Sequence, residues 1–344
     1  MSTLAPQINF GNTGIKISPI IVGCMSFGSK SWAEWVEDDK EKVFTILKYC
    51  YDHGLRTYDT ADVYSNGASE RLLGEFLRKF KIRRETVVIL TKTFFPTDES
   101  LDLGLGAGNN EQEALDLVNQ RGLSRKHILA GVQGSVERLG TYIDVLQIHR
   151  FDPETPIKET MKALNDVIEK DLVRYIGASS MLPTQFVEMQ SVAELYNWHK
   201  FVNVQSCYNL LYREDERDLN VYCKKHNIAL TPWSPNSQGI LTRPLGTKTE
   251  RYTTDKIIDA WDLNNLPKNE AEIVNRVEEL AKKKDIPMAV ISTAWVIHKG
   301  CAPIVGMSKT SRVDDAIKAL SVTFTEEELK YLEEPYQSKP FLFN

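Results

Sequence analysis

The sequence lacks the features of a secreted, membrane-spanning or nucleic-acid-binding protein. Its five cysteines are scattered and odd in number, which is typical of reduced thiols and not of a disulfide framework. No apolar run is long enough to span a bilayer, and the first residues lack the charged and apolar regions of a signal peptide. The net charge of -5 disfavours nucleic acid and anionic membranes as partners. These absences predict a soluble, cytoplasmic protein.

The sequence also lacks a pattern of metal ligands. None of its six histidines forms an HxxxH pair. Cys223 and His226 are one helical turn apart, but two ligands do not make a zinc site, and an exposed helix face explains the spacing more simply. We therefore expect no metal centre.

Length and composition are compatible with one large domain. The chain has 344 residues, is 42% hydrophobic and shows no compositional break. We therefore expect residues 1–344 to form a single α/β domain and not a pair of small ones.

Short apolar runs typical of strands alternate with segments of helical periodicity. Strands are expected at 20–22, 55–58, 87–91, 143–148, 173–177, 202–205, 228–232 and 303–305. Helices are expected at 39–53, 69–80, 125–139, 156–169, 183–195, 214–226, 287–299 and 310–320. Strict alternation implies parallel strands with right-handed crossovers. Eight such units predict a (β/α)8 TIM barrel.

Further elements are expected at both ends of this barrel sequence. Residues 8–10 and 15–17, joined by a Gly-Asn-Thr-Gly turn, predict a hairpin that covers the barrel floor. An amphipathic helix is expected over 269–284, and a capped C-terminal helix begins at Thr325.

Two stretches interrupt the alternation. Residues 96–123 carry glycines, asparagines and many acids and form a long insertion, for which we expect a mobile lid. Its Leu-Gly-Leu-Gly-Ala-Gly run is not expected to hold phosphate, because no buried strand feeds it directly and no phosphate-binding lysine follows. Residues 236–268 follow the seventh strand and are placed to fold over a bound cofactor.

Four polar residues stand where strands end. Asp59, Lys92 and His149 each come directly after a predicted strand, and Tyr64 follows Asp59 in the next loop. Because the carboxyl ends of barrel strands lie on one face, and barrel active sites lie on that face, we expect the four side chains to meet there.

These residue types suit the reduction of a carbonyl, which needs a hydride on carbon and a proton on oxygen beside a nicotinamide. Tyr64 can supply the proton, and the cation of Lys92 is expected to lower the tyrosine pKa toward the working range. Asp59 would hold the Lys92 ammonium in place, and His149 would donate a hydrogen bond to the substrate oxygen.

Each of the four also has an ordinary structural explanation. Asp59 can cap a turn, Tyr64 can be a half-buried loop aromatic, Lys92 can be solvated, and His149 can join a surface ion network. Their shared position on one face favours the catalytic interpretation over four separate structural ones.

Several segments resemble the aldo-keto reductases, and the resemblance extends over nearly the whole chain. The matching pieces are Gly54–Tyr64, Leu90–Lys92, Leu146–His149, Tyr175–Ser180 and Pro303–Lys309. Trp233-Ser234-Pro235 and the long insertion are similar to the aryl-alcohol-dehydrogenase-like branch of fungi, which is related to the potassium-channel β subunits. The resemblance implies that Asp59, Tyr64, Lys92 and His149 are the catalytic tetrad, with Tyr64 as the acid.

The resemblance also implies an NADPH site. Ser179, Ser180 and Gln205 would bind the nicotinamide carboxamide, Trp233 would stack on the ring, and the loop after the seventh strand would follow the pyrophosphate. The full implied set is Met25, Asp59, Ser179, Ser180, Gln205, Trp233, Ser234, Pro235, Asn236, Gln238, Gly239, Leu241, Arg243, Gly306, Ser308, Lys309, Arg312 and Asp315.

One part of this site has physical support that is independent of the resemblance. Ser308, Lys309 and Arg312 cluster at the start of the last barrel helix, where backbone N–H groups and cations favour a phosphate, and this points to NADPH over NADH. An ordinary helix start with solvated cations is the alternative. Asp315 and Ala316 stand where many relatives have Glu and Asn near the adenine. Arg243 matches the pyrophosphate-binding residue of the family less closely.

Aromatic and apolar loop residues are expected to line a substrate pocket: Met25, Phe27, Trp32, Phe94, Phe95 and Tyr208. Such walls favour bulky apolar or aromatic carbonyls. One of the two tryptophans Trp32 and Trp35 can equally pack against the barrel rim.

The sequence therefore predicts an NADPH-dependent aldehyde or ketone reductase of small molecules. The alternative is a regulatory or redox-sensing subunit that binds NADPH and turns over slowly. No oligomeric state is indicated.

Overall fold

The computed structural model describes residues 4–104, 110–247, 254 and 265–342 of the chain, and in these ranges eight parallel strands form one sheet. The strands are β3 (Ile21–Gly23), β4 (Thr57–Asp59), β5 (Val88–Thr93), β6 (Ile143–Ile148), β7 (Val173–Ser179), β8 (Phe201–Gln205), β9 (Ala229–Leu230) and β10 (Ile304–Gly306). They pair in the order β10-β3-β4-β5-β6-β7-β8-β9. Ala302 N–H donates to Leu230 O at 2.8 Å and Ile304 N–H donates to Pro232 O at 2.9 Å, which joins β9 to β10 and closes the ring.

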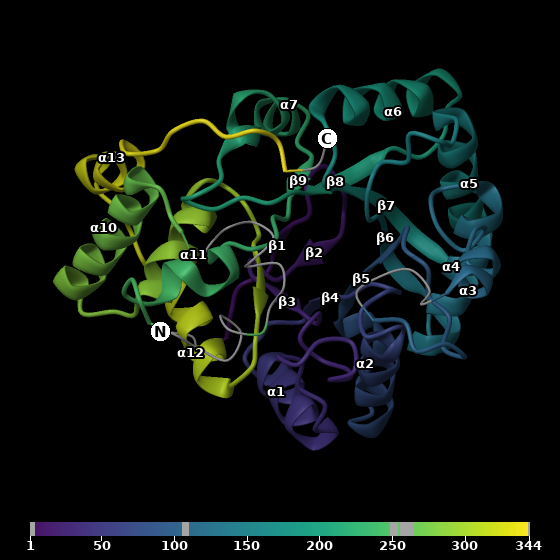
Figure 1. Cartoon of the computed structure of the whole chain (residues 1–344), viewed down its shortest axis with the longest axis horizontal. Coiled ribbons are helices and arrows are strands. Elements are labelled where there is room, and N and C mark those ends of the chain that lie inside the picture. The colour runs from purple at the N-terminus through teal and green to yellow at the C-terminus, as the bar shows by residue number, and fades with distance from the viewer. Residues whose placement is uncertain (1–3, 105–109, 248–253, 255–264, 343–344) are drawn as a thin grey trace.

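Helices surround this ring on the outside (Figure 1). The eight that follow the strands are α1 (Lys40–Asp52), α2 (Ala68–Lys79), α4 (Arg125–Leu139), α5 (Ile157–Glu169), α6 (Pro183–Leu195), α7 (Leu219–Lys225), α11 (Met288–His298) and α12 (Thr310–Ala319). Each alternates with a strand, so the predicted (β/α)8 barrel is confirmed.

The predicted accessory elements are present as well. Strands β1 (Ile8–Asn9) and β2 (Lys16–Ile17) form an antiparallel hairpin, whose neighbouring Phe10 packs with Leu90 and Val145 from the barrel strands. Helix α10 (Lys268–Lys284) and helix α13 (Glu326–Glu333) lie outside the barrel next to α11 (Figure 1). Thr325 caps α13 by accepting from Glu328 N–H, as the sequence predicted.

Two segments differ from the sequence prediction. The helix expected over 214–226 is split into a 3-10 turn, η2 (Glu214–Arg217), and α7. The split occurs at Asp218, whose non-helical backbone (φ -144°, ψ -61°) lets its carboxylate cap α7. The insertion 96–123 contains a short helix that was not predicted, α3 (Glu111–Asp116), which Asn110 caps.

The described part of this insertion is anchored to the barrel. Gly122 N–H donates to Phe94 O at 2.7 Å, and the Asn66 side chain donates to the carbonyls of Asp98 and Leu101 at 2.7 and 2.9 Å. The glycine-rich positions 105–109 lie outside the described residues. The mobile lid stays a prediction.

The barrel interior changes from apolar to polar along the strands. Side chains two residues apart on a strand point to the same side. Leu90 and Val145 therefore face inward below Lys92 and Gln147, and Lys92 lies opposite Gln147 in the register of β5 and β6. The apolar lower layer packs with the hairpin, and the polar upper layer forms the site described next.

Candidate active site

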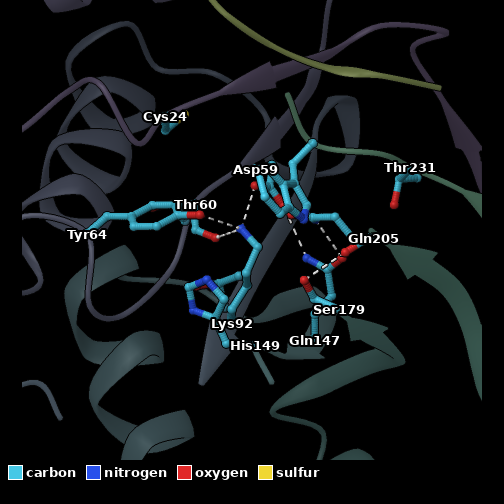
Figure 2. A network of polar contacts seen from close by, with 12 residues as sticks. Cys24, Asp59, Thr60, Tyr64, Lys92, Gln147, His149, Ser179, Gln205 and Thr231 are labelled. Atoms are coloured by element: carbon cyan, nitrogen blue, oxygen red, sulfur yellow. Dashed lines mark hydrogen bonds and ion pairs between the residues drawn. The ribbon is translucent and has the colours of Figure 1, made fainter. Parts of the chain in front are cut away.

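The side chains of Asp59, Tyr64 and Lys92 meet at the carboxyl end of the barrel (Figure 2). Lys92 Nζ donates to Asp59 Oδ1 at 2.5 Å, to Thr60 O at 2.8 Å and to the Tyr64 hydroxyl at 3.2 Å. These three acceptors match the three hydrogens of an ammonium group. Lys92 is 1% exposed and Asp59 2%, so the ion pair is removed from solvent.

Backbone pairing continues past the end of β4 and carries Tyr64 to this position. Thr60 N–H donates to Leu90 O at 2.9 Å, and Asp62 N–H donates to Lys92 O at 3.1 Å. The loop therefore follows strand β5 for several residues before it turns. This local structure brings the Tyr64 hydroxyl over the Lys92 side chain, although the two residues come from different strand-loop units.

Two amides hold the second oxygen of Asp59. Gln147 Nε2 donates to Asp59 Oδ2 at 3.1 Å, and Gln205 Nε2 donates to the same oxygen at 2.9 Å. Gln147 was not among the predicted site residues. The signal available in the sequence was its position two residues before His149, which places it on the inward face of the same strand.

His149 lies beside Tyr64 but does not belong to the hydrogen-bonded cluster in the described residues. Its ring centroid is 5.8 Å from that of Tyr64 and 5.1 Å from that of Phe95. Nδ1 is buried and has no hydrogen-bond partner in this part of the chain. Burial, reinforced by the cations of Arg150 and Lys92, holds the pKa of His149 well below its usual range. The ring is therefore neutral at physiological pH.

The net pKa shift of Tyr64 is opposite to the sequence prediction. Burial raises the pKa of the phenol, the cation of Lys92 lowers it, and the carboxylate of Asp59 raises it again; the balance lies above the usual value. The lowering expected from Lys92 is present but is outweighed because the phenolate would be buried. The pKa of Lys92 is also raised, since Asp59 and Tyr64 more than offset the effect of burial. Tyr64 therefore keeps its proton and Lys92 its charge near neutral pH.

A model of the Aldo/keto reductase family matches residues 19–337. The chain belongs to the aldo/keto reductase family. A Saccharomyces cerevisiae protein named "Putative aryl-alcohol dehydrogenase AAD16" is 62% identical over 334 residues, which cover 97% of this chain and 98% of the relative. The "Putative aryl-alcohol dehydrogenase C977.14c" of Schizosaccharomyces pombe is 50% identical over 349 residues, 99% of each chain. "Versiconal hemiacetal acetate reductase" of Aspergillus parasiticus is 45% identical over 331 residues, 96% of each.

These matches confirm the resemblance stated from the sequence, including its aryl-alcohol-dehydrogenase-like branch. This aldo/keto reductase is accordingly an oxidoreductase that interconverts carbonyls and alcohols with a nicotinamide cofactor. Within the described ranges, no helix is long and apolar enough to cross a bilayer, and no group of three potential ligands from His, Cys, Asp or Glu gathers.

Aromatic rings form a continuous wall that includes the rings of Tyr64 and His149 of this reductase. The ring centroids of Trp32 and Tyr64 are 6.2 Å apart, and those of Phe94 and Phe95 are 5.0 Å apart. Phe95 and Tyr64 both contact the His149 ring, so the wall runs from Trp32 to Phe94. Trp35 and Met25 pack on the Trp32 end.

Two predicted pocket residues of the aldo/keto reductase do not join this wall. Phe27 is 1% exposed and packs in the main hydrophobic core. Tyr208 is 3% exposed, its ring lies 5.2 Å from that of Trp295 on α11, and its hydroxyl donates to Glu216. Both rings are held in the interior, so we withdraw them from the predicted pocket.

Four residues implied to bind the nicotinamide lie together beside the reductase cluster. Gln205 contacts Asp59 directly, and the Ser179 hydroxyl donates to Gln205 O at 2.8 Å (Figure 2). Ser180 Oγ lies 3.2 Å from Ser179 Oγ and accepts from Trp233 Nε1 at 3.0 Å. The indole of Trp233 is thus fixed at the end of β9, next to the polar upper layer of the barrel.

The implied pyrophosphate loop has an unusual backbone. Ser234, Ser237, Gln238 and Gly239 all have left-handed φ values, 54°, 46°, 51° and 98°. Non-glycine residues rarely adopt this conformation, and such residues cluster at ligand sites. The Arg243 guanidinium packs over Gly239, 3.2 Å from the position that a Cβ would occupy.

A hydrogen bond from helix α11 holds the rest of this loop. The Ser292 hydroxyl donates to Asn236 Oδ1 at 2.5 Å, and Pro235 lies between Asn236 and Ser234 in the chain. Leu241 is fully buried in this loop. Of the segment 236–268 predicted to fold over the cofactor, residues 248–253 and 255–264 lie outside the described residues.

The implied adenosine site begins where β10 ends. Gly306, Ser308, Lys309, Arg312 and Asp315 follow one another from the last strand into the first turns of α12. Lys309 is the N-cap residue of α12 but its side chain makes no capping hydrogen bond, and both Lys309 and Arg312 are exposed. Burial raises the pKa of Asp315.

The lowered pKa of His149 predicts that its ring does not titrate in the physiological range. In the cofactor-free protein, the ring Cε1–H resonance of His149, assigned with His149→Gln, should titrate at a much lower pH than in the unfolded chain, because burial and two nearby cations lower the pKa of the ring. In the urea-unfolded chain the same resonance should titrate near about 6.5. A midpoint above pH 6 in the folded protein would contradict this.

Proposed function

We propose that this aldo/keto reductase reduces aldehydes and ketones to alcohols with NADPH, reversibly, and that Tyr64 donates the proton. The observation that carries the proposal is the buried Lys92 ammonium, which hydrogen-bonds both the Asp59 carboxylate and the Tyr64 hydroxyl. This arrangement places a fixed positive charge beside the hydroxyl that would become a phenolate.

Each residue of the cluster has a chemical task in this proposal. Tyr64 is protonated near neutral pH, which is the form that reduction requires, and transfers its proton to the carbonyl oxygen. Lys92 stabilises the phenolate left behind, and Asp59 keeps Lys92 charged and in place. The neutral His149 ring, beside Tyr64, offers a hydrogen bond to the same oxygen.

The residues around this cluster suit a nicotinamide cofactor, which supplies the hydride when bound. Gln205 and Ser179 offer amide and hydroxyl groups for the carboxamide, and Trp233 offers an apolar ring face. The left-handed backbone over 234–239 and the start of α12 are suited to phosphates. The exposed cations Lys309 and Arg312 favour a 2′-phosphate, and hence NADPH.

The aromatic wall supports bulky apolar or aromatic carbonyls as substrates. Trp32, Phe95 and Phe94 lie on both sides of Tyr64 and His149. Flat rings offer a large contact area to an aryl group and little to a small aliphatic aldehyde. The aryl-alcohol dehydrogenase names of two relatives agree with this class.

Replacing the proposed acid tests the proposal directly. Tyr64→Phe should lower NADPH oxidation by an aromatic aldehyde by about 10²–10⁴-fold, the usual contribution of a general acid. NADPH affinity, measured by fluorescence titration, should change by less than about threefold because the ring stays in place. The matched control is Tyr142→Phe, which makes the same change just before β6 at the opposite end of the barrel. Retained activity in Tyr64→Phe would remove Tyr64 from this role.

The cofactor preference depends on the start of α12. Arg312→Ala should weaken the binding of NADPH by about 10- to 100-fold, as expected for loss of a hydrogen bond to a charged group. The binding of NADH should stay nearly unchanged. Lys318→Ala, in the last turn of the same helix, is the control and should alter neither dissociation constant. An equal loss for NADPH and NADH would refute a contact with the 2′-phosphate.

A further inference from the structure

A chain of buried amides extends from the Asp59 carboxylate into the barrel. Asn203 Nδ2 donates to Thr231 Oγ1 and to Gln147 Oε1, both at 2.9 Å. Gln147 Nε2 then donates to Asp59 Oδ2. Asn203 and Gln147 are each 0% exposed, and neither is an ordinary apolar core residue.

The ionised carboxylate fixes the direction of every amide in this chain. An ionised carboxylate only accepts hydrogen bonds, so Gln147 must turn its nitrogen toward Asp59 and its oxygen away. That oxygen accepts from Asn203 Nδ2 and also from Gln205 Nε2 at 2.9 Å. At the far end, the Thr231 hydroxyl donates to Val204 O and so accepts from Asn203. No alternative amide orientation satisfies these contacts.

The same contacts set the orientation of Gln205. Its Nε2 donates both to Asp59 Oδ2 and to Gln147 Oε1, which uses both hydrogens of the amide. Its oxygen accepts no hydrogen bond from the described residues and is left available as an acceptor. An acceptor at this position suits the NH2 group of a nicotinamide carboxamide.

The barrel leaves room for this chain at one glycine. Gly177 lies opposite Gln147 in the register of β6 and β7. A Cβ on Gly177 would lie 1.9 Å from Asn203 Oδ1 and 3.2 Å from Gln147 Cγ. Any other residue at 177 would displace the amides, so the neighbouring strand is shaped around them.

We propose that Gln147 is a positioning residue with two effects: its amide nitrogen holds the Asp59 carboxylate toward Lys92, and its amide oxygen, together with Asp59 Oδ2, holds the Gln205 nitrogen and so keeps the Gln205 oxygen directed toward a bound nicotinamide. The inference rests on the proposed reductase function and adds a role for Gln147 that neither the sequence motifs nor the family resemblance assigned. Gln147 acts through Asp59 and Gln205 and touches neither substrate nor cofactor.

Two substitutions separate the effects. Gln147→Met keeps the length of the side chain and removes both polar groups. Gln147→Glu keeps the oxygen that accepts from Asn203 and Gln205 but replaces the amide donor to Asp59 with a carboxyl group, which donates only while it is protonated. The matched control is Gln190→Met, which makes the same change at a buried glutamine of α6 whose amide binds the Phe201 backbone, away from the site.

The first readout is equilibrium binding without turnover. Dissociation constants are measured for NADP⁺ and for its 3-acetylpyridine analogue, in which a methyl group replaces the NH2 donor. The wild-type protein and Gln147→Glu should bind NADP⁺ about five- to tenfold more tightly than the analogue, which is the range of one neutral hydrogen bond. In Gln147→Met this preference should be smaller, because the Gln205 amide then keeps only one of its two acceptors, Asp59 Oδ2.

The second readout is the split between kcat and KM for an aromatic aldehyde. Gln147→Met should lose about 10- to 100-fold in kcat with KM within about threefold, since the lost hydrogen bond is to a charged group. Gln147→Glu should lose kcat as the pH rises, because its carboxyl can donate to Asp59 only while it is protonated. Gln190→Met should lose thermal stability but keep kcat and the cofactor preference. Unchanged preference and kcat in Gln147→Met, or equal losses in Gln190→Met, would overturn the proposal. Failure of the wild-type protein to reduce any carbonyl would instead reject the reductase function, and the binding comparison would still decide the orientation of Gln205.

Discussion

The structure of the site depends on one buried ion pair, Lys92 with Asp59. Two charges removed from water are costly, and the cost is offset only where the geometry is good and the remaining hydrogen-bonding groups are satisfied. Here Thr60 O and the Tyr64 hydroxyl take the other hydrogens of the ammonium, and Gln147 and Gln205 occupy the second carboxylate oxygen. The proposed acid is one of the groups that satisfy the pair, so stability and chemistry share the same contacts.

The barrel provides the dry and rigid surroundings that this pair requires. The lower interior is filled by apolar side chains such as Leu90 and Val145, together with Phe10 beside the hairpin. Polar side chains enter two residues further along β5 and β6, where Lys92 and Gln147 lie opposite each other. Because strand ends fix these positions, the loops can vary the substrate wall without moving the cluster.

Much of this could be predicted from the sequence, and the omissions have physical reasons. Asp59, Lys92 and His149 were recognisable because a polar residue follows directly after each apolar strand. Gln147 lies within a strand, where a single amide interrupts the apolar pattern, and its side-chain partners Asp59, Asn203 and Gln205 come from two other strands. Phe27 and Tyr208 were assigned to the pocket because a loop aromatic can face either a ligand or the core, and only tertiary packing decides between them.

The short helix α3 and the break at Asp218 were missed for a similar reason, since a single capping side chain decides each of them. The direction of the Tyr64 pKa was missed because it is a balance between a cation, an anion and burial. The sequence identifies the cation, but the extent of burial belongs to the folded state.

The central claim is that Lys92 lowers the pKa of a buried Tyr64 that would otherwise be still harder to ionise. It is tested most directly by the ¹³C resonance of the Tyr64 Cζ atom in cofactor-free protein labelled at tyrosine, followed against pH in the wild-type chain and in Lys92→Met. The account predicts that Tyr64 is still mainly protonated at pH 10 in the wild-type protein, and that ionisation begins at a higher pH in Lys92→Met. Ionisation of wild-type Tyr64 below its usual value of about 10, or an identical titration in the two proteins, would contradict it.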